Sequence, residues 1–250
     1  MSKLLAEGLR RLFKGKRLYV VMIVFACLVA FIPILLSIIA HASDETGHAD
    51  EFLFVLAGQI PTFVSIVAGM MICQDFKNNT IRNKIIIGHS RTNIYLTNLI
   101  VSLIVMLIFF IINIVVMVVV GGILMPFKVF PCVGIFKKML LILAIETAFT
   151  STIVFICNSM KSTGGFVLAL CMHYILTTIE PFLNFIPYKH RKIREFIMEI
   201  VPSFQVTLVV YNSPVDGLPS KWLIMLISCV VITVVTTVLG IASFNKSDLK

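Results

Sequence analysis

The chain has 250 residues, of which 59% are hydrophobic and 13% are charged, and its mean hydropathy is +1.03. This composition excludes an ordinary soluble domain, and continuously apolar runs of more than about 18 residues exclude a β-barrel, whose strands alternate in polarity. The net charge of +9 would suggest nucleic-acid binding in a soluble chain, but in a membrane protein basic residues indicate the side of the bilayer. The sequence therefore predicts an all-α membrane protein with no nucleic-acid partner.

The chain begins with an amphipathic segment that leads into a long apolar run. Residues 3–14 place leucines at helical spacing opposite basic residues, which is typical of a helix lying on membrane lipid. Gly15 ends this segment, and the first span follows at about 18–40. Ala40-His41-Ala42 looks like a signal-peptide cleavage site, but the apolar run exceeds twenty residues and favours a retained span.

Five further apolar runs reach the length of about 20 residues that a helix needs to cross a bilayer. In chain order, the six predicted spans are about 18–40, 52–73, 93–120, 138–157, 164–182 and 221–244. Pro61 could kink the second span, which membrane helices tolerate. Together the spans predict a single transmembrane domain over residues 1–250.

The segment before the last span is also helical in pattern. Between Pro187 and Pro202, apolar residues recur at helical spacing with charged residues opposite, which predicts an amphipathic helix on the outer leaflet or on the outer mouth of the protein. Residues 204–211 are apolar but too short to span, so they could enter the membrane partway and return. The whole outer helical segment covers about residues 188–211.

Basic residues predict the orientation. Most Lys and Arg residues lie in the N-terminal segment, the polar stretch 74–92, the turn at Lys161 and the tail 245–250, whereas most acidic residues lie on the other side. Basic loops face the cytoplasm, so both termini should be cytoplasmic. The low-charge, Ile- and Lys-rich composition is compatible with a multi-pass protein of a bacterial plasma membrane.

A polar island separates the second and third spans. It runs from residue 73 to residue 84 and on to Arg91, and it carries four basic residues against one acid. Gly88 indicates the end of a helix and Ser90 the N-cap of the next one, so a short helix should cover about residues 75–87. This helix is either a surface for a cytoplasmic partner or a charged loop without a partner.

Residues 75–84 and the following Gly-His-Ser-Arg resemble the segment between the second and third spans of exporter-type ABC transporter permeases, the type-2 permease family. In that family an acidic-aromatic pair, a Thr-Ile-Arg-like core and a Ser-Arg pair form the coupling helix that seats on the ATPase subunit. The resemblance assigns the following residues to the ATPase contact: Asp75, Phe76, Asn79, Thr80, Ile81, Arg82, Asn83, Lys84 and Arg91.

The same resemblance implies the rest of the assembly. It implies ATPase subunits that bind ATP and Mg²⁺, a second permease, identical or not, and re-entrant helices before the last span. It also implies an amphipathic substrate such as an antimicrobial peptide, a lipid or a drug, and hence a possible role in antimicrobial peptide resistance.

No catalytic or metal-binding pattern is found in the sequence. Lys161-Ser162-Thr163-Gly164-Gly165 has the letters of a phosphate loop in the wrong order, so any ATP must be bound by another chain. The six cysteines contain no CxxC pair, and His41 and His48 are better explained as loop residues than as metal ligands. We expect a transport subunit without enzymatic activity, cofactor or metal of its own.

Three polar residues lie deep inside predicted spans, namely Asn113, Glu146 and His173. Ionisable groups at such depth are costly, so they either line a translocation path or clamp helices together. The fourth and fifth spans should be antiparallel neighbours, which predicts that Glu146 and His173 approach each other. Two other classes stay open: an ion exporter or channel without an ATPase would need a ring of charges along a span, and a lipid-modifying enzyme would need a polar cluster near one membrane face.

Overall fold

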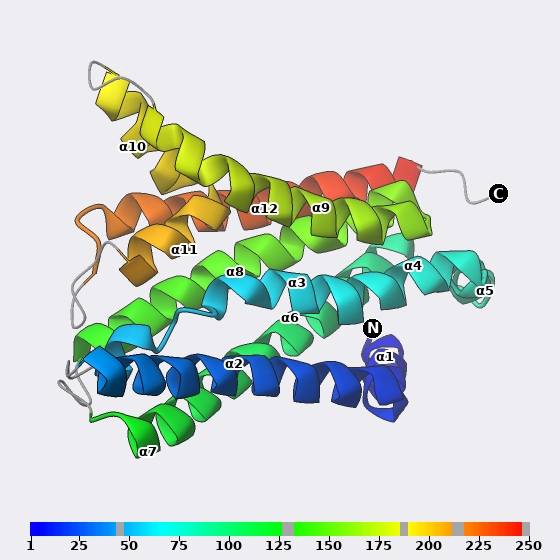
Figure 1. Ribbon diagram of the computed structural model, residues 1–250. Coiled ribbons are helices and arrows are strands. Elements are labelled where there is room, and N and C mark those ends of the chain that lie inside the picture. The colour runs from blue at the N-terminus through cyan, green and yellow to red at the C-terminus, as the bar shows by residue number, and fades with distance from the viewer. Residues whose placement is uncertain (44–47, 127–132, 186–189, 212–217, 247–250) are drawn as a thin grey trace.

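The computed structural model describes residues 1–43, 48–126, 133–185, 190–211 and 218–246 (Figure 1). Helices dominate these residues and no strand occurs among them. Six of the helical segments are long and apolar enough to cross a membrane: Lys16–Ala42, Ala57–Lys77, Arg91–Leu124, Val133–Met160, Thr163–Leu183 and Trp222–Lys246. The prediction of an all-α membrane protein with six spans is confirmed.

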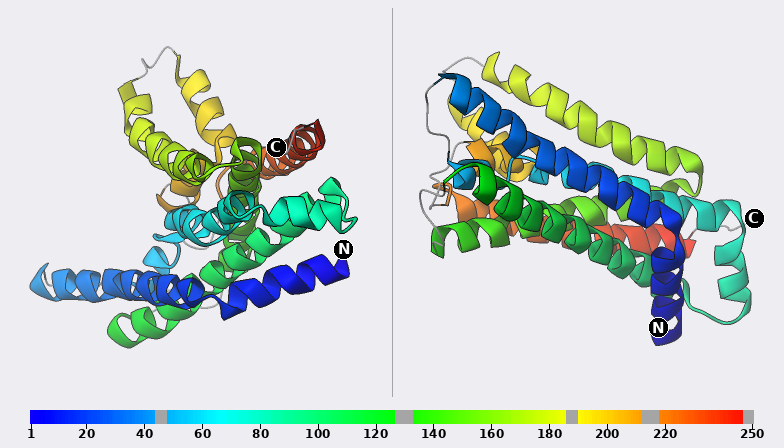
Figure 2. Two further views of the ribbon diagram at one scale, coloured as in Figure 1. Left: turned by 90° about the vertical axis from the view of Figure 1, so that its right-hand side faces the viewer. Right: turned by 60° about the horizontal axis from the view of Figure 1, so that its bottom comes forward.

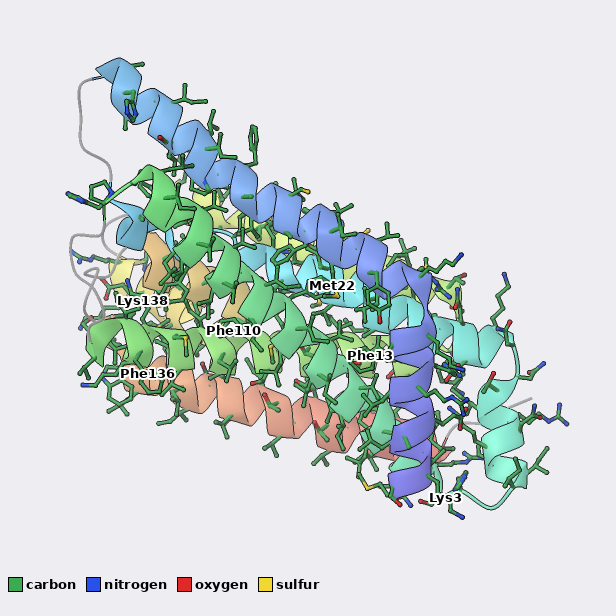
Figure 3. All side chains as sticks on the ribbon, turned by 90° about the horizontal axis from the view of Figure 1, so that it is seen from below. Lys3, Phe13, Met22, Phe110, Phe136 and Lys138 are labelled. Atoms are coloured by element: carbon green, nitrogen blue, oxygen red, sulfur yellow. The ribbon has the colours of Figure 1, made fainter. Side chains whose placement is uncertain are left out.

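The six spans run along one common direction and leave two distinct ends (Figure 1). One end carries α1, the α4–α5 turn, the α8–α9 turn and the last turn of α12, and we call it the basic end. The opposite end carries α7, α10 and α11 (Figure 1). Figure 3 marks the two ends with Lys3 of α1 and Lys138 of α8.

Helix α1 (Ser2–Lys14) lies across the basic end and turns sharply into α2 (Lys16–Ser43), as the right-hand view of Figure 2 shows. Its apolar face is not free, because Leu4 and Leu12 are buried. Gly8 allows the close approach to α6, since a Cβ there would lie 3.1 Å from Val101 Cγ2. The amphipathic pattern of α1 is thus used partly for packing on the bundle, and its position at the lipid surface stays a prediction.

The second span begins later than the apolar run suggests. A 3₁₀ turn (Ala49–Phe52) precedes the span, and a second 3₁₀ turn (Ala57–Gln59) begins it, so the helical part runs from Ala57 instead of residue 52. Pro61 lies in the first turn of α3, where the backbone N–H that proline lacks would have no partner within the helix. The span continues through three segments: α3 (Ile60–Val64), a π-helical turn (Ser65–Gly69) and α4 (Met70–Lys77).

The third span forms one side of the core. It follows the short helix α5 (Thr80–Ile86) and consists of α6 (Arg91–Val116), a π-helical turn (Met117–Gly121) and α7 (Gly122–Leu124). Phe109 of this span packs its ring against two others, with ring centroids 5.3 Å from Phe25 and 5.8 Å from Phe63. This aromatic cluster joins the first three spans.

The last three spans are built around α8 (Val133–Met160), whose long buried face contacts α6, α9 and α12. Helix α9 (Thr163–Ile179) continues into a 3₁₀ turn (Glu180–Phe185), and α12 (Trp222–Lys246) closes the chain. A hydrogen bond of 2.9 Å from Thr236 Oγ1 to Ser151 Oγ links α12 to α8 inside the apolar bundle. Helices α9 and α12 otherwise present mostly exposed apolar side chains.

The predicted outer helical segment is two helices, α10 (Arg191–Ile200) and α11 (Pro202–Tyr211). Val201 is extended because a residue before proline avoids helical angles, so the segment breaks there. The apolar side chains Ile193 and Phe196 of α10 are exposed, and the buried residue of this helix is Glu199. Residues 188 and 189 of the predicted segment and 247–250 of the tail lie outside the described residues.

Candidate partner-binding site at the basic end

The polar island folds into the end of α4, a tight turn and α5. Asn79 has a positive φ of 54°, which short polar side chains tolerate and which turns the chain between the two helices. Gly88, with φ of 97°, turns the chain again after α5. Ser90 Oγ then accepts a hydrogen bond of 3.3 Å from the backbone N–H of Asn93, so Ser90 caps α6 as the sequence predicts.

Asp75 is the centre of a buried ion-pair cluster, which we call the Asp75 cluster. One carboxylate oxygen lies 2.6 Å from Arg11 Nη2 of α1, and the other lies 3.3 Å from Lys84 Nζ of α5. Only 7% of the Asp75 side chain is exposed. The two ion pairs therefore hold α1, α4 and α5 together, and Asp75 faces the protein interior.

Phe76 and Arg91 also face inward, toward the end of α12. The ring of Phe76 packs edge-on against Phe244, with centroids 6.1 Å apart. Arg91 Nη1 donates hydrogen bonds to the backbone carbonyls of Phe244 (3.3 Å) and Asn245 (2.8 Å). A cation at the C-terminal end of a helix satisfies free carbonyl groups and interacts favourably with the helix dipole. These two residues thus fix the end of the last span.

The outer face of α5 carries a different set of residues. Asn79, Arg82 and Asn83 are exposed, and Thr80 is half-buried, whereas Ile81 and Lys84 are buried. The predicted ATPase contact therefore divides into an inward set and a solvent-facing set, which the sequence placed together. A linear motif cannot separate them, because the division depends on where α1 and α12 pack.

Sequence reasoning missed the two most exposed apolar side chains among the described residues of this end. Ile86 is 73% exposed and Ile87 is 76% exposed, directly after the buried positions of α5. The signal was present as a run of three isoleucines, in which helical spacing from Ile81 places Ile85 inward and leaves the next two outside. We call Arg82, Asn83, Ile86 and Ile87 the α5 outer face.

The structure does not join Glu146 and His173. Both are buried, and no hydrogen bond between them forms among the described residues, so their approach across the two helices stays a prediction. The His173 ring packs edge-on against Phe149, with centroids 5.5 Å apart. Helices α8 and α9 are neighbours, as the sequence predicts.

Asn113 has a packing role. Its Nδ2 donates a hydrogen bond of 3.2 Å to the backbone carbonyl of Leu53, and its side chain is fully buried. This bond fixes the turns that precede α3 against the third span. Of the three intramembrane polar residues, Asn113 is the one that clamps two segments together.

The fold and this polar end define a multi-pass helical membrane protein. Residues 12–180, from the last turn of α1 to the end of α9, match the family described as ABC-2 family transporter protein, and the chain belongs to this family. The protein is therefore a transmembrane permease subunit of an ABC transporter, a transport subunit and not itself catalytic. No curated protein matches the chain with significant similarity.

Proposed function

We propose that this chain is the permease of an ATP-driven exporter and that the α5 outer face binds a separate ATPase subunit. Two observations support the proposal: the family membership, and an exposed patch in which two isoleucines lie beside Arg82 and Asn83. Partner-binding surfaces are typically centred on apolar anchors with a polar rim. On this view ATP and Mg²⁺ are bound by the partner and not by this chain.

The single observation that carries the proposal is how α5 is attached. Lys84 binds Asp75, which also binds Arg11, so a force on α5 reaches α1 and α4 through buried contacts. Arg91, three residues after Gly88, holds the end of α12. A partner that moves α5 would therefore act on α1 and on the ends of the second and last spans at once, which is what coupling of ATP hydrolysis to transport requires.

The proposed orientation places the basic end in the cytoplasm of a bacterial cell. Basic segments favour the cytoplasmic side, and the described basic end gathers the N-terminal segment, the α4–α5 turn and the end of α12. The exposed apolar faces of α9 and α12 would meet lipid and a second permease, identical or different. The cargo would be amphipathic, such as an antimicrobial peptide, a lipid or a drug.

The test is ATPase activity that co-purifies with the tagged permease from the cells that express it. Replacing Ile86 and Ile87 together by serine should lower the co-purified MgATP hydrolysis about tenfold or more, because central apolar anchors of an interface contribute about 2 kcal/mol or more each. Ile123→Ser is the matched control. It changes an isoleucine of similar exposure, 78%, on α7 at the opposite end.

Insertion of each variant is checked by its yield in the membrane fraction and by its elution volume in detergent. Full ATPase co-purification with a normally inserted Ile86→Ser/Ile87→Ser variant would refute binding at the α5 outer face. An equal loss with Ile123→Ser would mean that the effect is not specific to this end.

A further inference from the structure

A cavity of about 310 Å³ opens at the basic end, between the α1–α2 junction and α4. We call it the α1–α4 cavity. One wall comes from the junction, where Gly15 separates the two helices, and the other wall comes from the second span. Neither the Glu146 region nor the α5 outer face contributes to the cavity.

The wall on the second span changes from apolar to polar along one direction. Val67, Met71, Gln74 and Asn78 line it in this order. Their spacings of four, three and four residues place them on one helix face, from the inside of the span to its end at Lys77. A ligand that fills the cavity must therefore have an apolar part toward the bilayer and a polar part toward the aqueous side.

The polar end of the cavity carries more positive than negative charge. Arg11 is bound to Asp75, but Arg17 Nη2 donates its hydrogen bond of 2.8 Å to the neutral side chain of Gln74. No carboxylate among the described residues forms an ion pair with Arg17, which is exposed at the cavity. The site thus holds a guanidinium group in place without a counter-charge.

We infer that the α1–α4 cavity binds an anionic phospholipid, with the lipid phosphate on Arg17 and an acyl chain along Met71 and Val67. A guanidinium group binds phosphate through two parallel hydrogen bonds, and basic pockets between membrane helices on the cytoplasmic side bind anionic headgroups. Asn78 and Thr80 at the polar end supply hydrogen-bonding groups for headgroup hydroxyls. The leaflet rests on the orientation proposed above, whereas the binding itself does not.

The experiment uses the purified full-length permease in an uncharged detergent, without an ATPase. Phosphatidylglycerol is titrated in and the Tm is recorded, because a ligand that binds the folded state raises the Tm in a saturable way. Phosphatidylcholine is the lipid control of zero net charge. We expect a saturable rise with phosphatidylglycerol and a much smaller one with phosphatidylcholine.

Three variants locate the binding site. Arg17→Gln should weaken phosphatidylglycerol binding about fivefold or more, which corresponds to the attraction of one basic side chain for an anionic lipid surface. Asn78→Asp places a negative charge at the polar end and should also weaken binding. Arg10→Gln is the matched control, since it removes the same charge from an exposed position of α1 that does not line the cavity.

Three results would overturn the inference. Equal weakening by Arg10→Gln would indicate general surface attraction, and unchanged binding by Arg17→Gln and Asn78→Asp would exclude this cavity. A full Tm rise with inorganic phosphate or glycerol 3-phosphate alone would identify a soluble ligand instead of a lipid. Because no ATPase is present, these results are independent of the co-purification test of the α5 outer face.

Discussion

Asp75 at the basic end and Glu195 at the opposite end have the same pairing geometry in different surroundings. Asp75 lies 2.6 Å from Arg11 and 3.3 Å from Lys84, and its side chain is 7% exposed. Glu195 lies 2.6 Å from Arg191 and 3.6 Å from Lys221, and its side chain is 32% exposed. The charged atoms are similarly placed, so any difference in the free energy that the two sets of ion pairs contribute to folding must come from their hydration.

The surroundings decide what each carboxylate does. A buried charge that loses its partner cannot regain its hydration, whereas an exposed pair is screened by water and salt and contributes little. The partners also differ, because Asp75 joins three helices and Glu195 pairs with its own helix and with the residue before α12. Asp75 should therefore determine the fold of the basic end, while Glu195 should only adjust the position of α10.

The largest effect is expected for Asp75→Asn. This change leaves Lys84, whose side chain is 11% exposed, without a counter-charge, and should cost about 3 kcal/mol of stability. The measurement is unfolding of the purified protein in detergent, followed by heat or denaturant. The control Glu7→Gln removes the same charge from an exposed position of α1 and should leave the stability unchanged.

A double variant separates charge burial from a simple loss of contacts. If the unpaired Lys84 causes the instability, then Asp75→Asn combined with Lys84→Met should be more stable than Asp75→Asn alone. Equal or additive losses would contradict this account of the Asp75 cluster.

The second largest loss of stability is expected when an uncharged residue of the opposite end, Gln205, is changed. Gln205 is fully buried, and its Nε2 donates to Ser228 Oγ at 2.6 Å and to the backbone carbonyl of Glu199. Gln205→Leu should cost about 2 kcal/mol, because it removes the amide that bonds both Ser228 and the Glu199 carbonyl and leaves that carbonyl only the long hydrogen bond of 3.4 Å from Ser228 Oγ. This would show that a neutral buried amide, and not the exposed charges, holds α10 and α11 to α12.

The same unfolding assay measures the effect of Gln205→Leu, with Asn83→Leu as an exposed amide control at the basic end. A cost for Gln205→Leu no larger than that of the control would mean that the outer helices are not held by this network.

The comparison also explains which features could be predicted from the sequence. The six spans follow from apolar runs, and Ser90 follows from local capping chemistry, because both depend on neighbouring residues only. The start of the second span was predicted too early, since Leu53 and its neighbours are apolar but form turns whose carbonyl is bound by Asn113. An apolar run thus predicts that a span is present more reliably than it predicts the residues at which the span begins and ends.

The residues of the candidate site could be found from the sequence, but the sequence could not divide them into an inward set and a solvent-facing set. Asp75 turns inward because of Arg11, which is 64 residues away, and Arg91 because of Asn245, which is 154 residues away. Ile86 and Ile87 become a surface only because α5 packs through its other face. The depths of Glu146 and His173 follow from the sequence, but the direction of each side chain depends on helix packing, which places the His173 ring against Phe149.

The smallest effect is expected for Glu195→Gln at the opposite end, and it should depend on pH and salt. The change removes a carboxylate whose side chain is 32% exposed, and it leaves the ion pair between Lys221 and the buried Glu199 in place. The hydrogen bond from Arg191 lowers the pKa of Glu195 below its usual 4.5, so its stabilisation is lost as the pH falls through the folded value.

The Tm difference between wild type and Glu195→Gln should therefore be greatest above about pH 5, and it should shrink as the pH falls through the folded pKa of Glu195. It should nearly vanish at about 1 M salt, where the screening length falls to about 3 Å. A loss of Tm that salt does not reduce, and that equals the loss for Asp75→Asn, would mean that the charges around Glu195 are as poorly hydrated as those of the Asp75 cluster. The two ends would then differ in position but not in energy, and hydration would no longer explain why Asp75 fixes the fold.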